Sequence, residues 1–315
     1  MTVLGYSEVR YYRHTGKAPV IGSTLAAVGA WIAVILLGTA YAYADLYVKV
    51  ADIASILILM AFGGAMGFAV YAVLKWGRVR NMLIAGIIAV TAGVLAWYAS
   101  WVMWEYALFA QSASAPPVSE MAADPHAIWR VAVAINREGT FTLNDRPVNG
   151  VELWLGWACE GLILIGFTAG IPLALMRDLA FCENCRIWTR RQKGIYRVNH
   201  GDEDVLREHM ENKNFDHLAK LGLSDAATPV HLRVDLHACP RCDQTNLLSV
   251  NRITIGYSQG NRRESVKKVV DRLWIDPQQA ADVRAVPQQI LAAMAIPAAE
   301  TSEAPTAEPS SEARN

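Results

Sequence analysis

Four long apolar runs constrain this chain more than any other feature. They cover residues 19–44, 53–74, 82–104 and 153–176, and only the fourth contains an acidic or basic side chain, Glu160. Each is at least as long as the roughly 20 residues that cross about 30 Å of hydrocarbon at 1.5 Å per residue. Because buried helices of a globular core rarely run so far without charge, residues 19–176 are predicted to form a membrane domain of four transmembrane helices.

Charge is unevenly distributed along the 315 residues. The chain has 29 Lys and Arg against 29 Asp and Glu, and only 18% of its residues are charged, below the quarter or so of soluble domains. Most of these charges follow residue 176, which predicts a polar domain after the membrane region. This composition excludes a disordered chain and a strongly basic nucleic-acid binder. The five cysteines exclude a disulfide-rich secreted scaffold.

Cations flanking the apolar runs predict the orientation. Arg10, Arg13 and Lys17 precede the first run, Lys75, Arg78 and Arg80 separate the second from the third, and five Lys and Arg follow the fourth within 17 residues. The external loop, residues 105–152, has few cations near the helix ends. By the positive-inside rule both termini are cytoplasmic, with residues 1–18 as a cytoplasmic N-terminal segment. A cleaved signal peptide ending near Ala44 is an alternative, but the run is about twice the usual length.

The external loop is expected to form a small cap. Residues 111–124 have the composition of a linker, residues 125–137 read as an amphipathic helix capped by Asp124, and residues 139–148 read as a hairpin turning at Asn144 and Asp145. Tryptophans gather at the outer ends of the third and fourth helices, where they suggest an interfacial aromatic belt or a platform for an external ligand. They are Trp97, Trp101, Trp104, Trp154 and Trp157.

Small residues recur at four-residue spacing inside the helices, at Gly63 and Gly67 and again at Gly166 and Gly170. Such positions allow helix backbones to approach closely. They are expected to serve packing within the bundle, and oligomerisation through Gly63 and Gly67 is an alternative.

Two CxxC pairs, Cys182 with Cys185 and Cys239 with Cys242, predict a metal site. Four thiolates complete a tetrahedral zinc shell without an open position, so the expected cofactor is one structural zinc per chain. Two disulfides would need an oxidising compartment, and a redox-active CxxC would need a thioredoxin-like context. Iron would accept the same ligands, although Arg186 and Asp243 stand where iron knuckles usually have glycine.

Residues 177–296 are predicted to form a small α+β domain resembling a zinc ribbon. We expect a hairpin over 186–198 that turns at residues 192–194, strands over 231–238 and 247–257, and a helical insertion over 202–223. Residues 265–274 fit a helix or a strand, and a strand is favoured. A helix is expected from Asp276 to Val286 and a second over 287–295, followed by a disordered acidic tail over 297–315.

A basic cluster precedes the predicted C-terminal helices. A solvated surface, a contact with anionic lipid headgroups and a nucleic-acid patch are all compatible with it, and interleaved acids make nucleic acid the least favoured. Its members are Arg262, Arg263, Lys267, Lys268 and Arg272.

Glu160 is expected to be the only carboxylate or amine inside the predicted spans. It is either a proton or cation site facing the bundle interior, or a structural carboxyl that is protonated or hydrogen-bonded to a tryptophan indole near the interface. The sequence contains no recognisable catalytic motif, and its histidines are scattered, with His209 and His217 too far apart for a helical metal pair. The chain is therefore expected not to be an enzyme.

The segment 11–17, the segment 77–81 and the two CxxC pairs resemble those of uncharacterised bacterial four-helix integral membrane proteins with a C-terminal zinc-ribbon-like domain. The resemblance implies a bacterial inner-membrane location and no known activity. The leading hypothesis is a membrane-anchored adaptor or sensor that binds a cytoplasmic protein partner. The alternative is a small transporter or channel centred on Glu160.

Overall fold

The structure, a computed structural model, describes residues 9–47, 52–110, 116–139, 142–143, 146–225, 227–258 and 261–295. The chain divides into two compact units. The helical unit comprises residues His14–Leu179. The sheet unit comprises the residues from Ala180 onward together with the N-terminal residues through Arg13. The expected tail over 297–315 lies outside the described residues.

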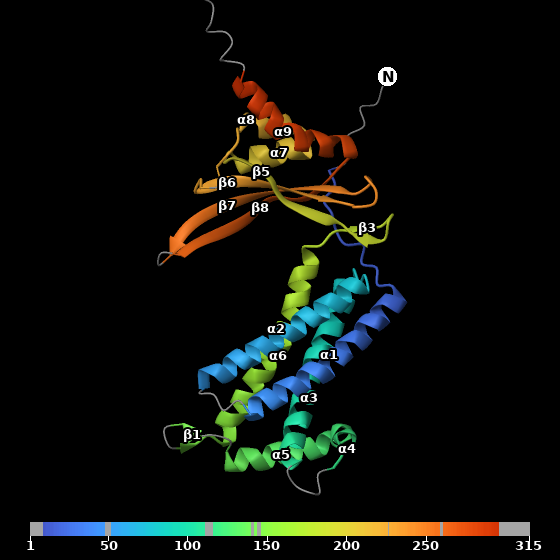
Figure 1. Ribbon diagram of the computed structural model, residues 1–315, viewed down its shortest axis with the longest axis vertical. Helices are drawn as coiled ribbons and strands as arrows, with labels where there is room; N and C mark the ends of the chain where they lie inside the picture. Colours follow the sequence, from blue (N-terminus) through green and yellow to red (C-terminus); the bar gives the residue numbers. More distant parts are fainter. Residues whose placement is uncertain are drawn as a thin grey trace, which may run out of the picture. The chain divides into compact units, whose positions relative to one another are not determined.

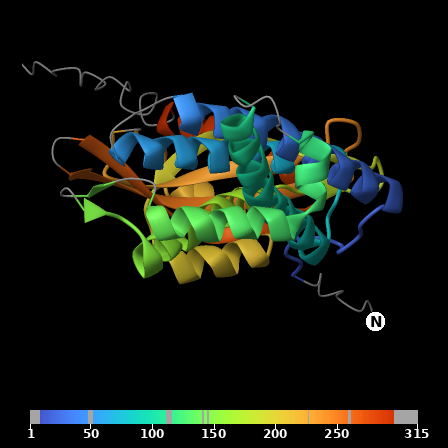
Figure 2. The same ribbon diagram turned by 90° about the horizontal axis from the view of Figure 1, so that it is seen from below.

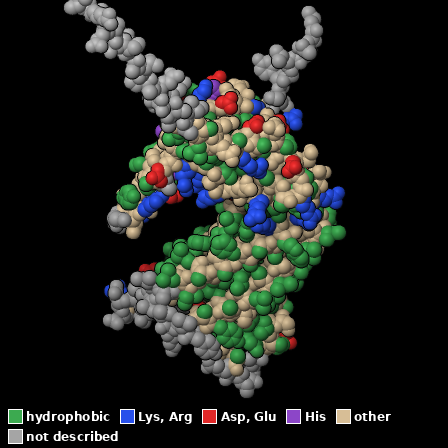
Figure 3. Space-filling view, turned by 45° about the horizontal axis from the view of Figure 1, so that its top comes forward, with side chains coloured by type: hydrophobic (Ala, Val, Ile, Leu, Met, Phe, Trp, Pro, Cys, Tyr) green, Lys and Arg blue, Asp and Glu red, His purple; other side chains and the backbone are tan. Residues whose placement is uncertain are grey.

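Four long helices build the helical unit (Figure 1). They are α1 (Val20–Tyr47), α2 (Asp52–Trp76), α3 (Met82–Phe109) and α6 (Gly150–Arg177). All four are long and apolar enough to cross a membrane, as the sequence predicts. Large apolar side chains cover their outer surface (Figure 3), and Val20 and Leu162 are 82% and 71% exposed. So large an apolar surface is typical of helices that face lipid.

Glycines set the distance between α2 and α6. A Cβ atom placed on Gly67 would lie 2.7 Å from the backbone oxygen of Phe167, and one on Gly63 would lie 3.0 Å from the Phe167 Cβ. The predicted packing role of these two glycines is confirmed, because α6 of the same chain occupies their face of α2. A Cβ on Gly166 or Gly170, in contrast, would have no neighbouring atom within 4 Å.

A cap of short elements lies across the ends of α3 and α6 (Figures 1 and 2). Helix α5 (Pro125–Glu138) is confirmed with its expected cap, since the Asp124 carboxylate accepts a hydrogen bond from the Ala127 N–H. The hairpin pairs β1 (Thr142–Leu143) with β2 (Arg146–Pro147). Part of the expected linker is instead a helix, α4 (Val118–Ala123), and residues 111–115 lie outside the described residues.

The tryptophans of the helical unit pack against one another. Trp101 meets Trp157 edge to face with ring centroids 4.8 Å apart, Trp157 meets Trp154 at 5.1 Å, and Trp154 stacks on Trp129 of α5 at 4.9 Å. These contacts join α3 and α6 to the cap. Since aromatic pairs in such geometries add about 0.5–1.5 kcal/mol to the burial of their area, the rings help to hold the cap in place.

A four-stranded antiparallel sheet forms the centre of the sheet unit, in the order β5-β6-β7-β8. The strands are β5 (Arg190–Asn199), β6 (Val230–Ala238), β7 (Asn246–Ser258) and β8 (Asn261–Ile275). Helices α7 (Glu203–Glu211), α8 (Asp216–Lys220) and α9 (Pro277–Ala295) cover one face (Figure 1). A separate hairpin pairs β3 (Phe181–Cys182) with β4 (Ile187–Trp188).

The hydrophobic core lies between the sheet and these helices. Leu232, Val234 and Leu236 of β6 are buried with Leu206 of α7 and Val283 of α9. Because side chains alternate along a strand, the intervening residues of β6 lie on the opposite face of the sheet. These are His231, Arg233, Asp235 and His237, all of them buried.

The predicted hairpin over 186–198 is wrong. Residues 190–199 form the single strand β5, which pairs with β6 on both sides of a register shift between Gln192 and Tyr196. Gly194, with a φ of 65°, forms a bulge rather than a turn. A β-bulge and a hairpin turn both favour glycine at a positive φ, so the local sequence does not distinguish a bulge from a turn.

The predicted strand over 265–274 is confirmed as part of β8, which pairs with β7. The predicted helix break at Pro287 is wrong, because α9 continues through it. Val283, Val286 and Ile290 are buried on one face on both sides of the proline. Their packing against the sheet holds the helix continuous despite the hydrogen bond that proline removes.

Part of the N-terminal segment belongs to the sheet unit. The Tyr12 N–H donates to the Arg272 oxygen at 2.8 Å, and the Trp274 N–H donates to the Arg10 oxygen at 2.9 Å. The Tyr12 hydroxyl accepts a hydrogen bond from the Phe181 N–H at 2.9 Å. The segment expected to stand apart as residues 1–18 therefore contributes residues 9–13 to the sheet unit, as an N-terminal strap.

The strap also restricts the number of membrane crossings. Tyr12 precedes the first apolar helix, and Phe181 follows the last one. Two residues in contact lie on the same side of a membrane, so the chain between them crosses it an even number of times. The four candidate spans satisfy this condition.

Candidate metal centre

Both CxxC pairs occupy tight turns between antiparallel strands. Cys182 ends β3 and Cys185 lies in the turn before β4, while Cys239 and Cys242 lie between Ala238 of β6 and its partner Asn246 of β7. Each pair thus has a paired strand on both sides. The hairpins therefore direct all four thiols toward one point.

The four sulfur atoms converge. All lie within 4.8 Å of one another, and the Sγ atoms of Cys182 and Cys242 are 3.7 Å apart. A tetrahedral site with Zn–S bonds of about 2.3 Å requires sulfurs about 3.8 Å apart, whereas a disulfide requires about 2.05 Å. All five cysteines are free thiols. The arrangement fits a four-thiolate metal site, and the predicted ligands are brought together.

Backbone groups support the first turn. The Cys185 N–H points at the Cys182 sulfur, with a nitrogen–sulfur distance of 3.5 Å, and Arg186 has a φ of 54°. Left-handed backbone at this position explains why glycine is common there. Arg186 adopts it without being glycine, so its presence does not discriminate between zinc and iron.

The crowded thiols differ in acidity. Burial raises the pKa of Cys182, but hydrogen bonds from the Thr245 side chain and the Cys185 N–H outweigh it and lower the pKa to about 7. Hydrogen bonding with Cys242 raises the pKa of Cys185 to about 12, and burial raises the pKa of Cys239. Binding of a divalent metal by these residues would require their thiolate forms and would displace the thiol protons.

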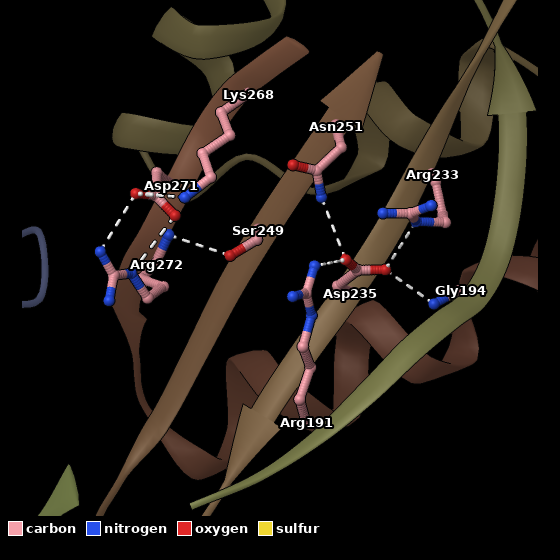
Figure 4. Close-up of polar contacts among 9 residues, drawn as sticks. All are labelled: Arg191, Gly194, Arg233, Asp235, Ser249, Asn251, Lys268, Asp271 and Arg272. Carbon is pink, nitrogen blue, oxygen red and sulfur yellow. Dashed lines mark hydrogen bonds and ion pairs between the residues drawn. The ribbon is translucent and has the colours of Figure 1, made fainter. Parts of the chain in front are cut away.

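A buried charge cluster lies on the sheet face opposite the helices (Figure 4). Asp235 is fully buried and accepts hydrogen bonds from Arg191 Nη2 at 2.7 Å, the Gly194 N–H at 2.7 Å, Arg233 Nε at 3.1 Å and Asn251 Nδ2 at 3.1 Å. Sequence analysis missed this cluster. The sequence pattern that could have predicted it is the alternation of Arg233, Asp235 and His237 with aliphatic residues along β6.

Glu160 has a definite partner in the helical unit. The Tyr41 hydroxyl of α1 donates to its Oε1 atom at 2.8 Å, and the Tyr41 ring stacks on Phe62 of α2 with centroids 4.5 Å apart. The carboxyl group therefore joins α6 to α1, and the Tyr41 ring continues the contact to α2. Its partner is a tyrosine hydroxyl and not the expected tryptophan indole.

Within the predicted bounds Glu160 is still the only carboxylate or amine, but the helices extend beyond those bounds. The longer candidate spans also include, near their ends, Asp45, Lys75, Glu105, Glu152 and Arg177. Glu105 is 1% exposed, and its Oε1 atom has no hydrogen-bond partner. Sequence analysis ended the third run at Trp104, one residue too early to include it.

His209 and His217 stack with ring centroids 4.2 Å apart. They meet because α7 ends before α8 begins, which sequence spacing along a single helix does not reveal. Within the part of the chain that the structure describes, the four cysteines are the side chains that lie close enough together to hold a metal ion.

No family model matches the chain, and neither a curated protein nor a solved structure does. The fold and the site therefore define only a class: a chain with four helices able to span a membrane, joined to a small sheet domain whose four cysteines could bind a metal ion.

Proposed function

We propose that this chain is a multi-pass protein of a bacterial inner membrane that anchors a cytoplasmic zinc domain and acts as a protein-interaction adaptor. The observation that carries the proposal is the closed set of four convergent thiols in a domain joined to four apolar helices. A site with four protein ligands leaves no position for a substrate, so its zinc is structural. Cys182, Cys185, Cys239 and Cys242 would hold the ion.

The cations that flank the helices favour a cytoplasmic sheet domain. Reduced thiols persist in that compartment, which favours metal over disulfides. The external cap is compatible with a sensing form of the same role, in which the cap binds a ligand outside and the zinc domain binds its partner inside. The resemblance to uncharacterised four-helix membrane proteins points the same way.

Metal analysis of the full-length chain in detergent tests the zinc site. One zinc ion per chain is expected, and Cys239→Ser should reduce the content to near zero. Full-length protein is required because the N-terminal strap is part of the sheet unit. A native chain that folds without any bound metal would contradict the proposal. Finding one iron ion per chain would show that the site holds iron and not zinc.

The adaptor role needs a separate test. Proximity labelling in cells, with the labelling enzyme fused to the C-terminus, should identify cytoplasmic proteins enriched by the native chain and lost with Cys239→Ser. Glu160→Gln serves as a matched control, because it leaves the cysteines intact. Identical labelling by all three chains would contradict a zinc-dependent adaptor.

A transporter centred on Glu160 is the second candidate, because this carboxyl lies well inside the apolar helix α6, and an ionisable side chain in such a helix commonly marks an ion pathway. Glu160→Gln keeps the size of the side chain and removes its charge. Proton or cation flux into liposomes should fall severalfold with this variant, and a flux unchanged from the native chain would eliminate the candidate.

A further inference from the structure

The hairpin of β7 and β8 extends beyond the rest of the sheet. Strand β6 begins at Val230, which pairs with Thr254, whereas β7 and β8 continue to pair as far as Ser258 with Asn261. At about 3.4 Å per residue, the four further residues of β7 project roughly 14 Å past the edge of β6. We call residues 253–258 and 261–268 the hairpin arm.

The two faces of the arm differ in chemistry. Residues paired across antiparallel strands share a face. One face carries all the large apolar side chains of the arm, together with Arg262, Glu264 and Lys268, and we call it the apolar face. The opposite face carries Thr254, Gly256, Arg263, Ser265 and Lys267. The apolar side chains are Ile253, Ile255, Tyr257 and Val266.

Two large apolar side chains of this face are open. Tyr257, near the tip of the arm, is 76% exposed, and Val266, on the edge strand β8 opposite Ile253, is 50% exposed, while Ile253 and Ile255 are buried. The Arg262 and Lys268 side chains on the same face are each 48% exposed. Figure 3 shows Lys and Arg side chains gathered along the arm. Tyr257 lies opposite Arg262, and Val266 lies between Glu264 and Lys268 along β8. The face therefore combines two exposed apolar side chains with two cations and one acid.

We propose that the apolar face of the hairpin arm binds the surface of a bilayer that contains anionic phospholipids. Tyr257 and Val266 enter the interfacial layer, and Arg262 and Lys268 meet the lipid phosphates. Tyrosine suits this position because its ring is apolar and its hydroxyl stays hydrated. The proposal rests on the membrane location of the chain and does not depend on the adaptor role.

Connectivity favours lipid over RNA as the occupant. Residue Ala180 begins the sheet unit three residues after Arg177, the last residue of α6. So short a tether holds the domain at a high effective concentration near the bilayer, where even weak contacts form. Single-stranded RNA binding commonly uses several stacking aromatics, and Tyr257 is the one aromatic residue of the arm.

The test uses the full-length chain in nanodiscs, with the photocrosslinker p-benzoylphenylalanine replacing Tyr257. Lipid adducts are counted by mass spectrometry in phosphatidylcholine alone and in mixtures with phosphatidylglycerol. We expect severalfold more adducts in the anionic nanodiscs. Each cation removed from an anionic surface should lower the yield about fivefold, the equivalent of about 1 kcal/mol.

Arg262→Gln and Arg263→Gln form a matched pair, since they remove the same charge from adjacent positions on opposite faces. Arg262→Gln should reduce the adducts, and Arg263→Gln should leave most of them. Unchanged metal content confirms that each variant is folded. Equal yields in neutral and anionic nanodiscs, equal effects of both variants, or adducts that move to an added oligoribonucleotide would each overturn the proposal.

Discussion

Asp235 accepts four hydrogen bonds, although it is a buried acid in the middle of a strand. Its partners explain how a charged residue is accommodated there. Two arginines, the Gly194 bulge and Asn251 satisfy both of its oxygens. Burying a charge without such partners is costly. The bulge in β5 therefore has a specific role, because it turns one backbone N–H toward the carboxylate.

Replacing Asp235 by leucine should be severely destabilising. The change leaves Arg233 buried without a counter-charge, and breaking a buried pair in this way costs about 3–5 kcal/mol. Denaturant unfolding of the detergent-solubilised chain, followed through metal release, measures the loss. Asp271→Asn is the control, because Asp271 is partly exposed and should matter by less than about 1 kcal/mol. A loss as small as that of the control would contradict this account.

Glu203 gives the sheet unit a defined pH dependence. A hydrogen bond from Lys267, with the nearby charge of Arg252, holds the pKa of Glu203 below its usual value. A lowered pKa in the folded state means that the stabilisation is complete above the unfolded-state pKa of about 4.3 and is lost as pH falls through the folded-state pKa.

Glu203→Gln should therefore lower the free energy of unfolding by up to about 1 kcal/mol at neutral pH, and its difference from the native chain should disappear in acid. Thermal unfolding across the acid range measures this. Glu264→Gln, which alters an exposed pair, controls for general acid effects. A difference between Glu203→Gln and the native chain that persists in strong acid would show that packing, not charge, is responsible.

At the scale of elements, helix packing depends on a few small residues. The carbonyl of Phe167 and the side chain of Ile171 lie against Gly67. Gly67→Ala should force α2 and α6 apart and destabilise the helical unit by about 1–3 kcal/mol, as overpacking does.

Gly166→Ala is the matched control, because a Cβ there meets no atom within 4 Å. Thermal unfolding in detergent should separate the two variants clearly. If Gly166→Ala proved the more damaging one, Gly166 would have a neighbour outside this chain.

Elements also show where local sequence is insufficient. Asp276 and Gln279 cap α9 reciprocally, so its start is predictable from the sequence. Its continuation through Pro287 is not, because burial of Val286 and Ile290 against the sheet is a tertiary effect. Likewise, the Gln-Lys-Gly segment of β5 looks like a turn until the partner strand is known.

At the scale of the whole molecule, the N-terminal strap joins strand β8 to the segment that begins the metal centre. The Tyr12 hydroxyl accepts a hydrogen bond from the N–H of Phe181, the residue before Cys182. The Arg272 guanidinium lies over the Tyr12 ring, 5.5 Å from its centroid. Tyr12→Ala should loosen the first cysteine turn and accelerate zinc release to a chelator severalfold. Tyr11→Phe is the control, since it removes only the hydrogen bond to Glu211. Equal rates of zinc release from Tyr12→Ala and Tyr11→Phe would show that the strap does not stabilise the metal centre.

The same contact predicts that the two termini share one side of the membrane. Reporter fusions at each end, or cysteine labels probed with impermeant reagents in intact cells, should give the same result at both. We expect both ends to be protected in the cytoplasm. Opposite accessibility of the two ends is incompatible with the contact between Tyr12 and Phe181.

By itself, the sequence determined the four apolar helices and the four cysteines of the candidate metal site. Both can be recognised within a short stretch of sequence, since the hydropathy of a span and the spacing of a CxxC pair do not depend on residues far away in the chain. Only the tertiary structure decided the burial of Asp235 and Glu105, the continuity of α9 and the place of the strap. Each of these depends on contacts between residues far apart in the chain, whose energies outweigh local preference.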